Sequence, residues 1–270
     1  MSGNSGNLFN RDHMHFYKYQ GTGNDFILLD NRTTKIVLDQ PTIDRLCDRK
    51  FGIGADGLML LENAEGYDFK MVYYNSDGNE STMCGNGGRC MTAFAKQLGV
   101  INSAASFLAT DGPHTATVHV DETVRLEMNN VSDIKLFEGY AVLNTGSPHY
   151  VIWSNDVAGT DVFNEGKRIR NSDTYREQGI NVNFAQTVSE NKLLVRTYER
   201  GVEDETLSCG TGVVASAIAS TLLETGKFTI EVDTPGGRLQ VSFVKDTPSS
   251  ATAVLLTGPA KFVFEGDILF

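Results

Sequence analysis

Residues 83–90 read Met-Cys-Gly-Asn-Gly-Gly-Arg-Cys, and residues 208–212 read Ser-Cys-Gly-Thr-Gly. In both stretches a cysteine and a glycine come directly before a run of small and apolar residues that is typical of a helix. The two cysteines, Cys84 and Cys209, are 125 residues apart. The same spacing separates Glu80 from Glu205, Asp56 from Asn181, and Gly112 from Gly237. Four pairs at one spacing predict a duplicated domain, with two halves related by pseudo-twofold symmetry.

The strand and helix patterns of each half favour an α+β fold. Helices are predicted for residues 40–50, 84–98 and 209–224, and Gly99 and Gly226 are expected to stop the last two. Strands are predicted for residues 15–30, 67–75, 115–128, 139–153, 192–198, 228–232, 238–245 and 251–264. Many short strands with one long helix per half differ from the alternation of a doubly wound sheet. We therefore expect each half to be a curved, barrel-like sheet around a central helix.

The same patterns divide the chain into four parts. Residues 1–13 are polar and without a pattern, so we expect them to be a leader outside the fold, with Met14 as the natural start. Residues 14–128 are expected to form the N-terminal half and residues 129–258 the C-terminal half. Residues 259–270 are strand-like and have no counterpart in the pattern of the second half. We expect this tail to return to the N-terminal half.

Composition and charge exclude several classes of function. An apolar fraction of 40% and a charged fraction of 21% are ordinary for a globular protein. The net charge of −11 and the lack of a basic stripe argue against a nucleic-acid partner. No run approaches the ~20 apolar residues of a membrane helix, and no secretory pattern opens the chain. Four cysteines without such a signal indicate reduced thiols in the cytoplasm, and no Cys or His spacing predicts a metal site.

The two Cys-Gly turns carry the chemistry. The positive end of a helix dipole is expected to stabilise a thiolate at the helix start. The free N–H groups of residues 85–87 and 210–212 can bind a carboxylate. One thiolate can then remove a proton from the Cα of a bound amino acid while the opposing thiol returns one. A single such turn is most often a tight turn around a buried cysteine, but the second copy favours a proton-transferring enzyme.

At these motifs the chain resembles the diaminopimelate epimerase family. The resemblance runs from about Met14 to Phe270 and includes the stretches at residues 21–26, 52–57, 75–80, 83–89, 146–149, 179–184, 198–201 and 209–212. It implies an epimerase that interconverts LL- and meso-diaminopimelate without a cofactor, in lysine and peptidoglycan biosynthesis. It also implies two similar halves with the active site in the cleft between them, and a homodimer.

The resemblance further implies roles for individual residues. Cys84 and Cys209 match the two catalytic cysteines, and Gly85, Asn86, Gly210 and Thr211 match residues that hold the reacting carboxylate. Asn24, Asn75, Asn181 and Arg200 match residues that bind mainly the distal end of the substrate, whereas Glu199 and His149 match residues near the second and the first cysteine. A planar guanidinium suits a distal carboxylate, and amides can both donate and accept hydrogen bonds.

One position departs from the family pattern. The family usually has Gly-Asn-Pro-His where residues 146–149 read Gly-Ser-Pro-His, so Ser147 replaces a contact to the distal head group. Serine is shorter than asparagine and offers one donor where the amide offers two. Asp56 is expected to fix a loop and not to act on the substrate, because the chemistry needs no third acid.

Three other classes stay open. Proline and hydroxyproline racemases share the two-cysteine logic but usually have His after the first Cys-Gly, where this chain has Asn86. An isomerase of the phenazine type lacks the cysteine pair. A non-catalytic amino-acid binding protein could keep the same cleft. No lysine lies in the motifs, so no pyridoxal cofactor is expected. Closure of the halves about residues 128–133 and the tail is expected to desolvate the site.

Overall fold

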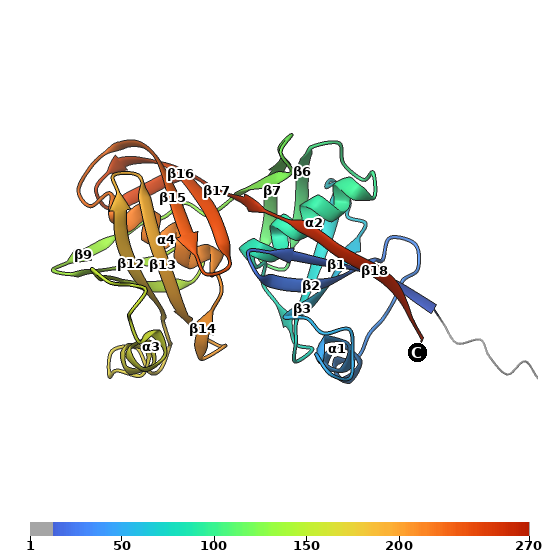
Figure 1. Cartoon of the computed structure of the whole chain (residues 1–270). Helices are drawn as coiled ribbons and strands as arrows, with labels where there is room; N and C mark the ends of the chain where they lie inside the picture. The colour runs from blue at the N-terminus through green and yellow to red at the C-terminus, as the bar shows by residue number, and fades with distance from the viewer. Residues whose placement is uncertain (1–12, 270) are drawn as a thin grey trace, which may run out of the picture.

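Each half of the chain threads its strands in the same order around one long helix (Figure 1). The computed structural model describes residues 13–269. The first half contains β1 (His13–Gly21), β2 (Asn24–Asp30), α1 (Gln40–Cys47), β3 (Gly57–Glu62), β4 (Phe69–Asn75), β5 (Glu80–Ser81), α2 (Gly85–Gln97), β6 (Ala104–Ala109), β7 (Gly112–Val118) and β8 (Thr123–Glu127). The expected leader lies outside the described residues, except for His13 at the start of β1.

The second half repeats this order element by element. It contains β9 (Lys135–Phe137), β10 (Tyr140–Asn144), β11 (Pro148–Trp153), α3 (Val162–Arg170), β12 (Asn181–Ser189), β13 (Lys192–Glu199), β14 (Asp204–Thr206), α4 (Gly210–Ser220), β15 (Gly226–Thr234), β16 (Gly237–Thr247) and β17 (Ser250–Pro259). The last strand, β18 (Lys261–Leu269), leaves this half and pairs antiparallel with β1. Figure 1 shows it crossing from the second lobe to the first.

The strand pairings make the duplication explicit. Neighbouring strands run β18-β1-β2-β3-β4-β6-β7-β8 in the first half and β9-β10-β11-β12-β13-β15-β16-β17 in the second. Both halves have parallel pairs at equivalent places, β2 with β3 and β4 with β6, and β11 with β12 and β13 with β15. The four residue pairs spaced by 125 fall on equivalent positions of these strands and turns. The predicted fold class is therefore confirmed.

Small residues allow α2 and α4 to lie inside their sheets. Helix α4 is apolar on all sides, as expected for a helix surrounded by strands, and residues 212–219 are buried. Strands β10 to β13 and β15 to β17 contact it. Helix α2 is enclosed in the same way by strands of its own half and by β17 and β18. It ends at Gln97 with Leu98 as its C-cap residue, and Gly99 then takes a positive φ of 70°, as predicted for its stop.

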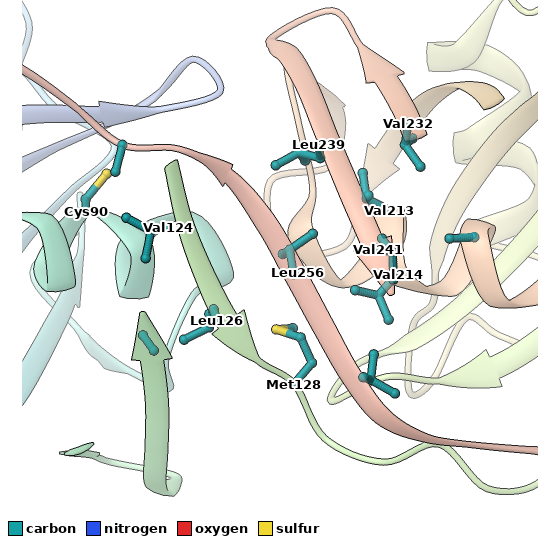
Figure 2. Close-up of a cluster of buried hydrophobic side chains, with 14 of the residues drawn as sticks. Cys90, Val124, Leu126, Met128, Val213, Val214, Val232, Leu239, Val241 and Leu256 are labelled. Atoms are coloured by element: carbon teal, nitrogen blue, oxygen red, sulfur yellow. The ribbon is translucent and has the colours of Figure 1, made fainter. Parts of the chain in front are cut away.

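The two half-sheets join through one strand pair. β8 and β17 pair antiparallel, from Thr123 opposite Pro259 to Glu127 opposite Leu255. Leu256 on β17 packs beneath the first glycine of both central helices, because a Cβ at Gly85 or Gly210 would lie 3.4 or 3.3 Å from its Cδ2. Figure 2 shows Leu256 between the side chains of the two halves, beside Met128. The hydrophobic core is therefore continuous across the halves.

Several predicted boundaries were wrong. The segments 15–30, 115–128 and 139–153 are hairpins, not single strands, and the first turns at Thr22 and Gly23, both with positive φ. The second long helix ends at Ser220 and not at residue 224. The elements that were not predicted are helix α3 and strands β3, β5, β6, β9, β12 and β14. The tail does have a counterpart in the second half, since β9 lies beside β10 as β18 lies beside β1.

Candidate active site

A cleft of about 830 Å³ lies between the halves and collects nearly all the predicted site residues. Its lining includes the predicted residues Asn24, Asn75, Cys84, Gly85, Asn86, Ser147, Asn181, Glu199, Arg200, Cys209, Gly210 and Thr211. Among the predicted site residues, His149 does not line it and is fully buried. Two polar motifs 125 residues apart thus contribute to one cavity.

The starts of the two central helices meet at this cleft. Cys84 is the N-cap residue of α2, and Cys209 is the N-cap residue of α4. The helix tips abut, because a Cβ at Gly210 would lie 3.6 Å from the Cα of Gly85. The side chain of Asn86 donates from Nδ2 to the carbonyl oxygen of Ser208 across this junction, at 3.0 Å. The fold therefore presents both thiols to one small volume.

The pKa values of the two thiols run against the expectation from the helix dipole alone. Burial raises the pKa of Cys84, and the carboxylate of Glu199 raises it further. Burial and Glu199 raise the pKa of Cys209 in the same way. Backbone N–H groups at both helix starts act in the opposite direction, as predicted, but burial outweighs them. In the ligand-free protein the cleft therefore favours protonated thiols.

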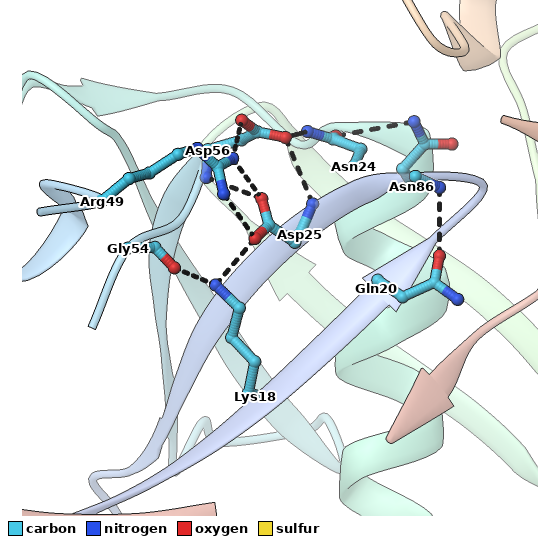
Figure 3. A network of polar contacts seen from close by, with 9 residues as sticks. Lys18, Gln20, Asn24, Asp25, Arg49, Gly54, Asp56 and Asn86 are labelled. Atoms are coloured by element: carbon cyan, nitrogen blue, oxygen red, sulfur yellow. Dashed lines mark hydrogen bonds and ion pairs between the residues drawn. The ribbon is translucent and has the colours of Figure 1, made fainter. Parts of the chain in front are cut away.

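A carboxylate network fixes the wall of the cleft beside Cys84 (Figure 3). Asp56 accepts hydrogen bonds from Asn24 Nδ2 at 2.6 Å and from the backbone N–H of Asp25 at 3.2 Å, and Arg49 donates to its other oxygen at 2.7 Å. Burial raises the pKa of Asp25, but hydrogen bonds from Arg49 and Lys18 outweigh it and lower that pKa to about 2. This geometry agrees with the predicted loop-fixing role of Asp56.

The opposite wall holds Ser147, Asn181 and Arg200, three of the residues expected at the distal end of a substrate, whereas Asn24 and Asn75 line the cleft from the first half. Asn181 donates from Nδ2 to the hydroxyl oxygen of Ser147 at 2.8 Å, and its Oδ1 accepts the backbone N–H of Arg200 at 2.9 Å. The guanidinium of Arg200 donates to the same serine oxygen at 3.3 Å. At the position where this chain departs from the family pattern, the hydroxyl oxygen of Ser147 therefore accepts hydrogen bonds from both Asn181 and Arg200.

Glu199 lines the cleft within electrostatic reach of both thiols. Burial raises its pKa, although a hydrogen bond from Thr206 at 2.8 Å acts against this. The carboxylate of Asp56 also raises it. A half-buried carboxylate near two cysteines suits a contact to a substrate ammonium group. The positive charge of that group would stabilise the ionised form of Glu199, which burial disfavours.

His149 lies behind the cleft in the second half. Its Nδ1 is 3.1 Å from Asn183 Nδ2, so this nitrogen accepts, and burial lowers its pKa to about 3. Asn183 also accepts from Thr197 at 3.0 Å and donates to the carbonyl of Tyr150 at 3.1 Å. A Cβ at Gly212 in the first turn of α4 would lie 2.2 Å from Asn183 Oδ1. Asn183 thus braces the helix of the second cysteine, and His149 braces Asn183.

Sequence reasoning missed Asn183 and Arg89. Asn183 was visible as the second asparagine of Asn-Val-Asn at residues 181–183. Arg89 is fully buried in α2, where it donates to Asn86 Oδ1 at 2.9 Å and to the carbonyl of Gly85 at 3.3 Å. No ion pair within residues 13–269 involves it. The sequence signal that could have identified Arg89 is its place directly after the glycine-rich start of a predicted helix.

Neither a metal centre nor a membrane helix is found in the part of the chain that the structure describes. Residues 13–269 contain no cluster of three or more His, Cys, Asp or Glu side chains that could hold a metal ion. None of their helices is long and apolar enough to cross a membrane. The cleft is lined by two thiols, side-chain amides, hydroxyls, carboxylates and the guanidinium groups of Arg49 and Arg200.

A protein-family model for diaminopimelate epimerase matches residues 16–134 and 141–263. The chain belongs to the diaminopimelate epimerase family. It is 54% identical over 260 residues to the diaminopimelate epimerase of Flavobacterium psychrophilum, and the match covers 94% of this chain and all of that protein. This family membership confirms the resemblance drawn from the cysteine and asparagine motifs.

Solved structures outside the diaminopimelate epimerase family share its fold. The chain matches a phenazine biosynthesis protein of the PhzF family from Bacillus anthracis with a TM-score of 0.70 at 14% identity, covering 96% of this chain and all of that one. It matches a probable proline racemase from Agrobacterium radiobacter with a TM-score of 0.68 at 14% identity, covering 94% and 92% of the two chains. These likenesses concern the fold alone.

Proposed function

We propose that this protein interconverts LL- and meso-diaminopimelate by moving the α-proton between Cys84 and Cys209, without a cofactor. The observation that carries the proposal is the meeting of two N-cap cysteines at one cleft. The family and its curated relatives support the substrate. The reaction belongs to the synthesis of lysine and of peptidoglycan precursors.

The proposed reaction uses the two thiols in opposite protonation states. The thiolate of one cysteine takes the α-proton, and the electron pair left at the α-carbon is delocalised into the carboxylate. The thiol of the other cysteine then returns a proton to the opposite face. Backbone N–H groups at Gly85, Asn86, Gly210 and Thr211 hold that carboxylate and stabilise the charge it gains.

The distal end of the substrate is proposed to bind at the opposite wall. Arg200 and Asn181 present donors and acceptors there, with Ser147 between them. Asn24 and Asn75 complete the polar lining of the other wall, and Glu199 meets an ammonium group. His149 supports the wall of the second half from behind, through Asn183. A second amino-acid head group needs such a site, whereas proline does not, so this wall favours diaminopimelate over the racemase alternative.

The proposal extends to the division of the chain, its location and its oligomeric state. We assign residues 14–128 and 129–258 to the two halves and residues 259–270 to the returning tail, and the pairing of β18 with β1 supports this division. A cytoplasmic location agrees with the free thiols of all four cysteines. Sedimentation equilibrium tests the homodimer that the family resemblance implies.

The decisive experiment is turnover of LL-diaminopimelate in D₂O without added pyridoxal phosphate. We expect meso product with deuterium at the inverted carbon, and a loss of at least about 100-fold in rate for Cys84→Ala and for Cys209→Ala. Cys47→Ala, at a buried thiol of α1 outside the cleft, controls for loss of a cysteine. Folded, reduced protein that neither epimerises nor exchanges the α-proton contradicts the proposal.

A further inference from the structure

Two asparagine side chains beside Cys84 form a chain between charged residues. Arg89 donates to Asn86, Asn86 donates to Asn24 from Nδ2 to Oδ1 at 3.5 Å, and Asn24 donates to Asp56. Figure 3 shows the Asn24 end of this chain and the contact of Asp56 with Arg49. A guanidinium can only donate hydrogen bonds, and an ionised carboxylate can only accept them. The charged ends therefore fix the direction of every hydrogen bond between them.

The orientation of the Asn86 amide is fixed from the Arg89 end. Its Oδ1 accepts from the guanidinium at 2.9 Å and from the hydroxyl of Thr22 at 3.3 Å. Its Nδ2 must then face away, where the carbonyl oxygen of Ser208 accepts from it at 3.0 Å. A flipped amide would set donor against donor at Arg89 and acceptor against acceptor at Ser208.

The orientation of the Asn24 amide is fixed from the Asp56 end. Asn24 Nδ2 donates to Asp56 Oδ2 at 2.6 Å, and Arg49 holds the other oxygen of that carboxylate. Asn24 Oδ1 is left to face the cleft, where it lies 3.7 Å from the sulfur of Cys84. A carbonyl oxygen can accept from an S–H group but offers nothing to a thiolate. This contact therefore stabilises the protonated form of Cys84.

We propose that Asp56 is a positioning residue that turns Asn24 Oδ1 toward Cys84 and so makes Cys84 the cysteine that keeps its proton when one thiol of the pair ionises. Cys209 has a different neighbour, because its sulfur lies 3.5 Å from the hydroxyl oxygen of Thr211. A hydroxyl can donate to a thiolate as well as accept from a thiol. Cys209 is thus the member of the pair that has a side-chain donor for its charged form.

Other groups that face Cys84 also act on its pKa, and two of them, Glu199 and Tyr73, themselves feel the carboxylate of Asp56. Burial has the largest effect and raises it, the backbone N–H groups of Gly87 and Asn86 lower it, and Glu199 raises it. Arg89 lowers it from within α2. Cys209, Cys90 on the same helix and the phenol of Tyr73 on β4 also lie within electrostatic reach of Cys84. None of these groups hydrogen-bonds to Asp56 in the described chain. A charge effect of Asp56 through Glu199 does not need Asn24, so comparing Asp56→Asn with and without Asn24 tests the amide chain.

The inference rests on the proposed function for its consequence. If Cys84 and Cys209 exchange the α-proton, the resting protein accepts directly the epimer whose α-proton points at Cys209. Turnover leaves the cysteines in the reverse state, and Asn24 then draws a proton back to Cys84. Asp56 therefore sets which cysteine begins each cycle, although it hydrogen-bonds to neither sulfur in the described chain.

The test is the pH dependence of Cys84 alkylation by iodoacetamide in the full-length protein, read by mass spectrometry of the peptide that contains Cys84. In Asp56→Asn, the guanidinium of Arg49 keeps the side-chain oxygen of residue 56 facing it, so the new NH₂ group faces Asn24. Two facing NH₂ groups repel, and this favours the flipped orientation of the Asn24 amide. Asn24 Nδ2 then faces the sulfur and stabilises a thiolate. We expect the alkylation midpoint to fall by about one pH unit, which is about tenfold more thiolate below the midpoint.

Three further variants separate positioning from charge and from general damage. Asp77→Asn removes a carboxylate from the same cleft but leaves Asn24 in place, so the midpoint should not move. In an Asn24→Ala background, Asp56→Asn should lose its effect. Asn24→Ala alone should lower the midpoint, which keeps the idea testable if Asp56→Asn does not fold. An unchanged midpoint in folded Asp56→Asn, or an equal shift with and without Asn24, overturns the proposal.

Alkylation needs no substrate, so this result is independent of turnover. A shifted alkylation midpoint in a protein that does not epimerise diaminopimelate would support the role of the amide chain and contradict the proposed function. Normal epimerisation without a shift of the alkylation midpoint would support the proposed function and contradict the role of the amide chain.

Discussion

His149 carries no charge in the folded protein at neutral pH. Burial lowers its pKa to about 3, and the guanidinium of Arg200 contributes in the same direction. The ordinary value for histidine is about 6.5. Between these two pH values the unfolded chain binds a proton that the folded chain does not, so the free energy of unfolding falls as the pH falls.

This difference gives a prediction for stability at acid pH. Between pH 6.5 and pH 4 the wild type should lose up to about 1.4 kcal/mol of unfolding free energy per pH unit through this group alone. His149→Gln keeps an acceptor for Asn183 but cannot titrate, so its stability curve should be flatter by that amount. Urea unfolding at a series of pH values measures both curves, with His119→Gln as the control at a less buried histidine. Parallel curves for wild type and His149→Gln would refute the argument.

Residue identities at the site could be predicted from the sequence, but their hydrogen-bond partners could not. The motifs named both cysteines and every asparagine of the cleft, because each motif carries its own residue types. The contact of Asn24 with Asp56 joins residues 32 apart, and that of Asn86 with Ser208 joins residues 122 apart. Such contacts, and the burial that raises the pKa of both thiols, depend on how the halves pack.

The first turns of the two central helices differ in what surrounds them. Gly87 and Gly212 occupy the same position, three residues after their cysteines. A Cβ at Gly87 would lie 3.2 Å from the sulfur of Met59 and 3.4 Å from Met71, and both side chains are flexible. A Cβ at Gly212 would lie 2.2 Å from Asn183 Oδ1, which Thr197 holds in place.

Gly212→Ala should therefore cost more than Gly87→Ala. We expect Gly212→Ala to lower the free energy of unfolding by about 1–3 kcal/mol, because the amide of Asn183 must move and loses its partners. Gly87→Ala should cost less than about 1 kcal/mol, since the methionines can adapt. Urea unfolding of the two variants at neutral pH makes the comparison. Equal losses would show that Asn183 is not fixed as described.

The elements that escaped sequence prediction share a physical cause. Strand β3 reads Gly-Leu-Met-Leu-Leu-Glu and is almost wholly buried, so it lacks the alternation of a half-exposed strand. Helix α3 contains Gly166, which weakens its helical pattern. That glycine is needed because a Cβ there would lie 2.3 Å from the Cβ of Tyr198. In both cases tertiary packing overrides the local signal.

The two halves are held together in more than one way. The β8–β17 ladder joins their sheets, and Leu256 packs beneath both helix starts. The isolated bridge between Val131 and Ala251 lies beside the first covalent connection. Any closure of the cleft must therefore rotate the halves about this ladder, since it cannot separate them.

Such closure predicts a change in overall size on binding. A Cys84→Ala, Cys209→Ala double variant can bind diaminopimelate without turning it over. Its radius of gyration from small-angle X-ray scattering should fall when the ligand saturates it, with proline as the ligand control. Scattering profiles that superimpose with and without diaminopimelate would rule out closure of the halves.

The pairing of β1 with β18 has a consequence for synthesis on the ribosome. Met14 lies opposite Ile268, so the two strands emerge 254 residues apart. At about 5–20 residues per second, the first strand waits roughly 10–50 seconds for its neighbour. During translation the nascent first lobe thus carries an open strand edge, the kind of surface at which chains aggregate. Completion of the N-terminal barrel belongs to the last moments of synthesis, after the second lobe has already emerged.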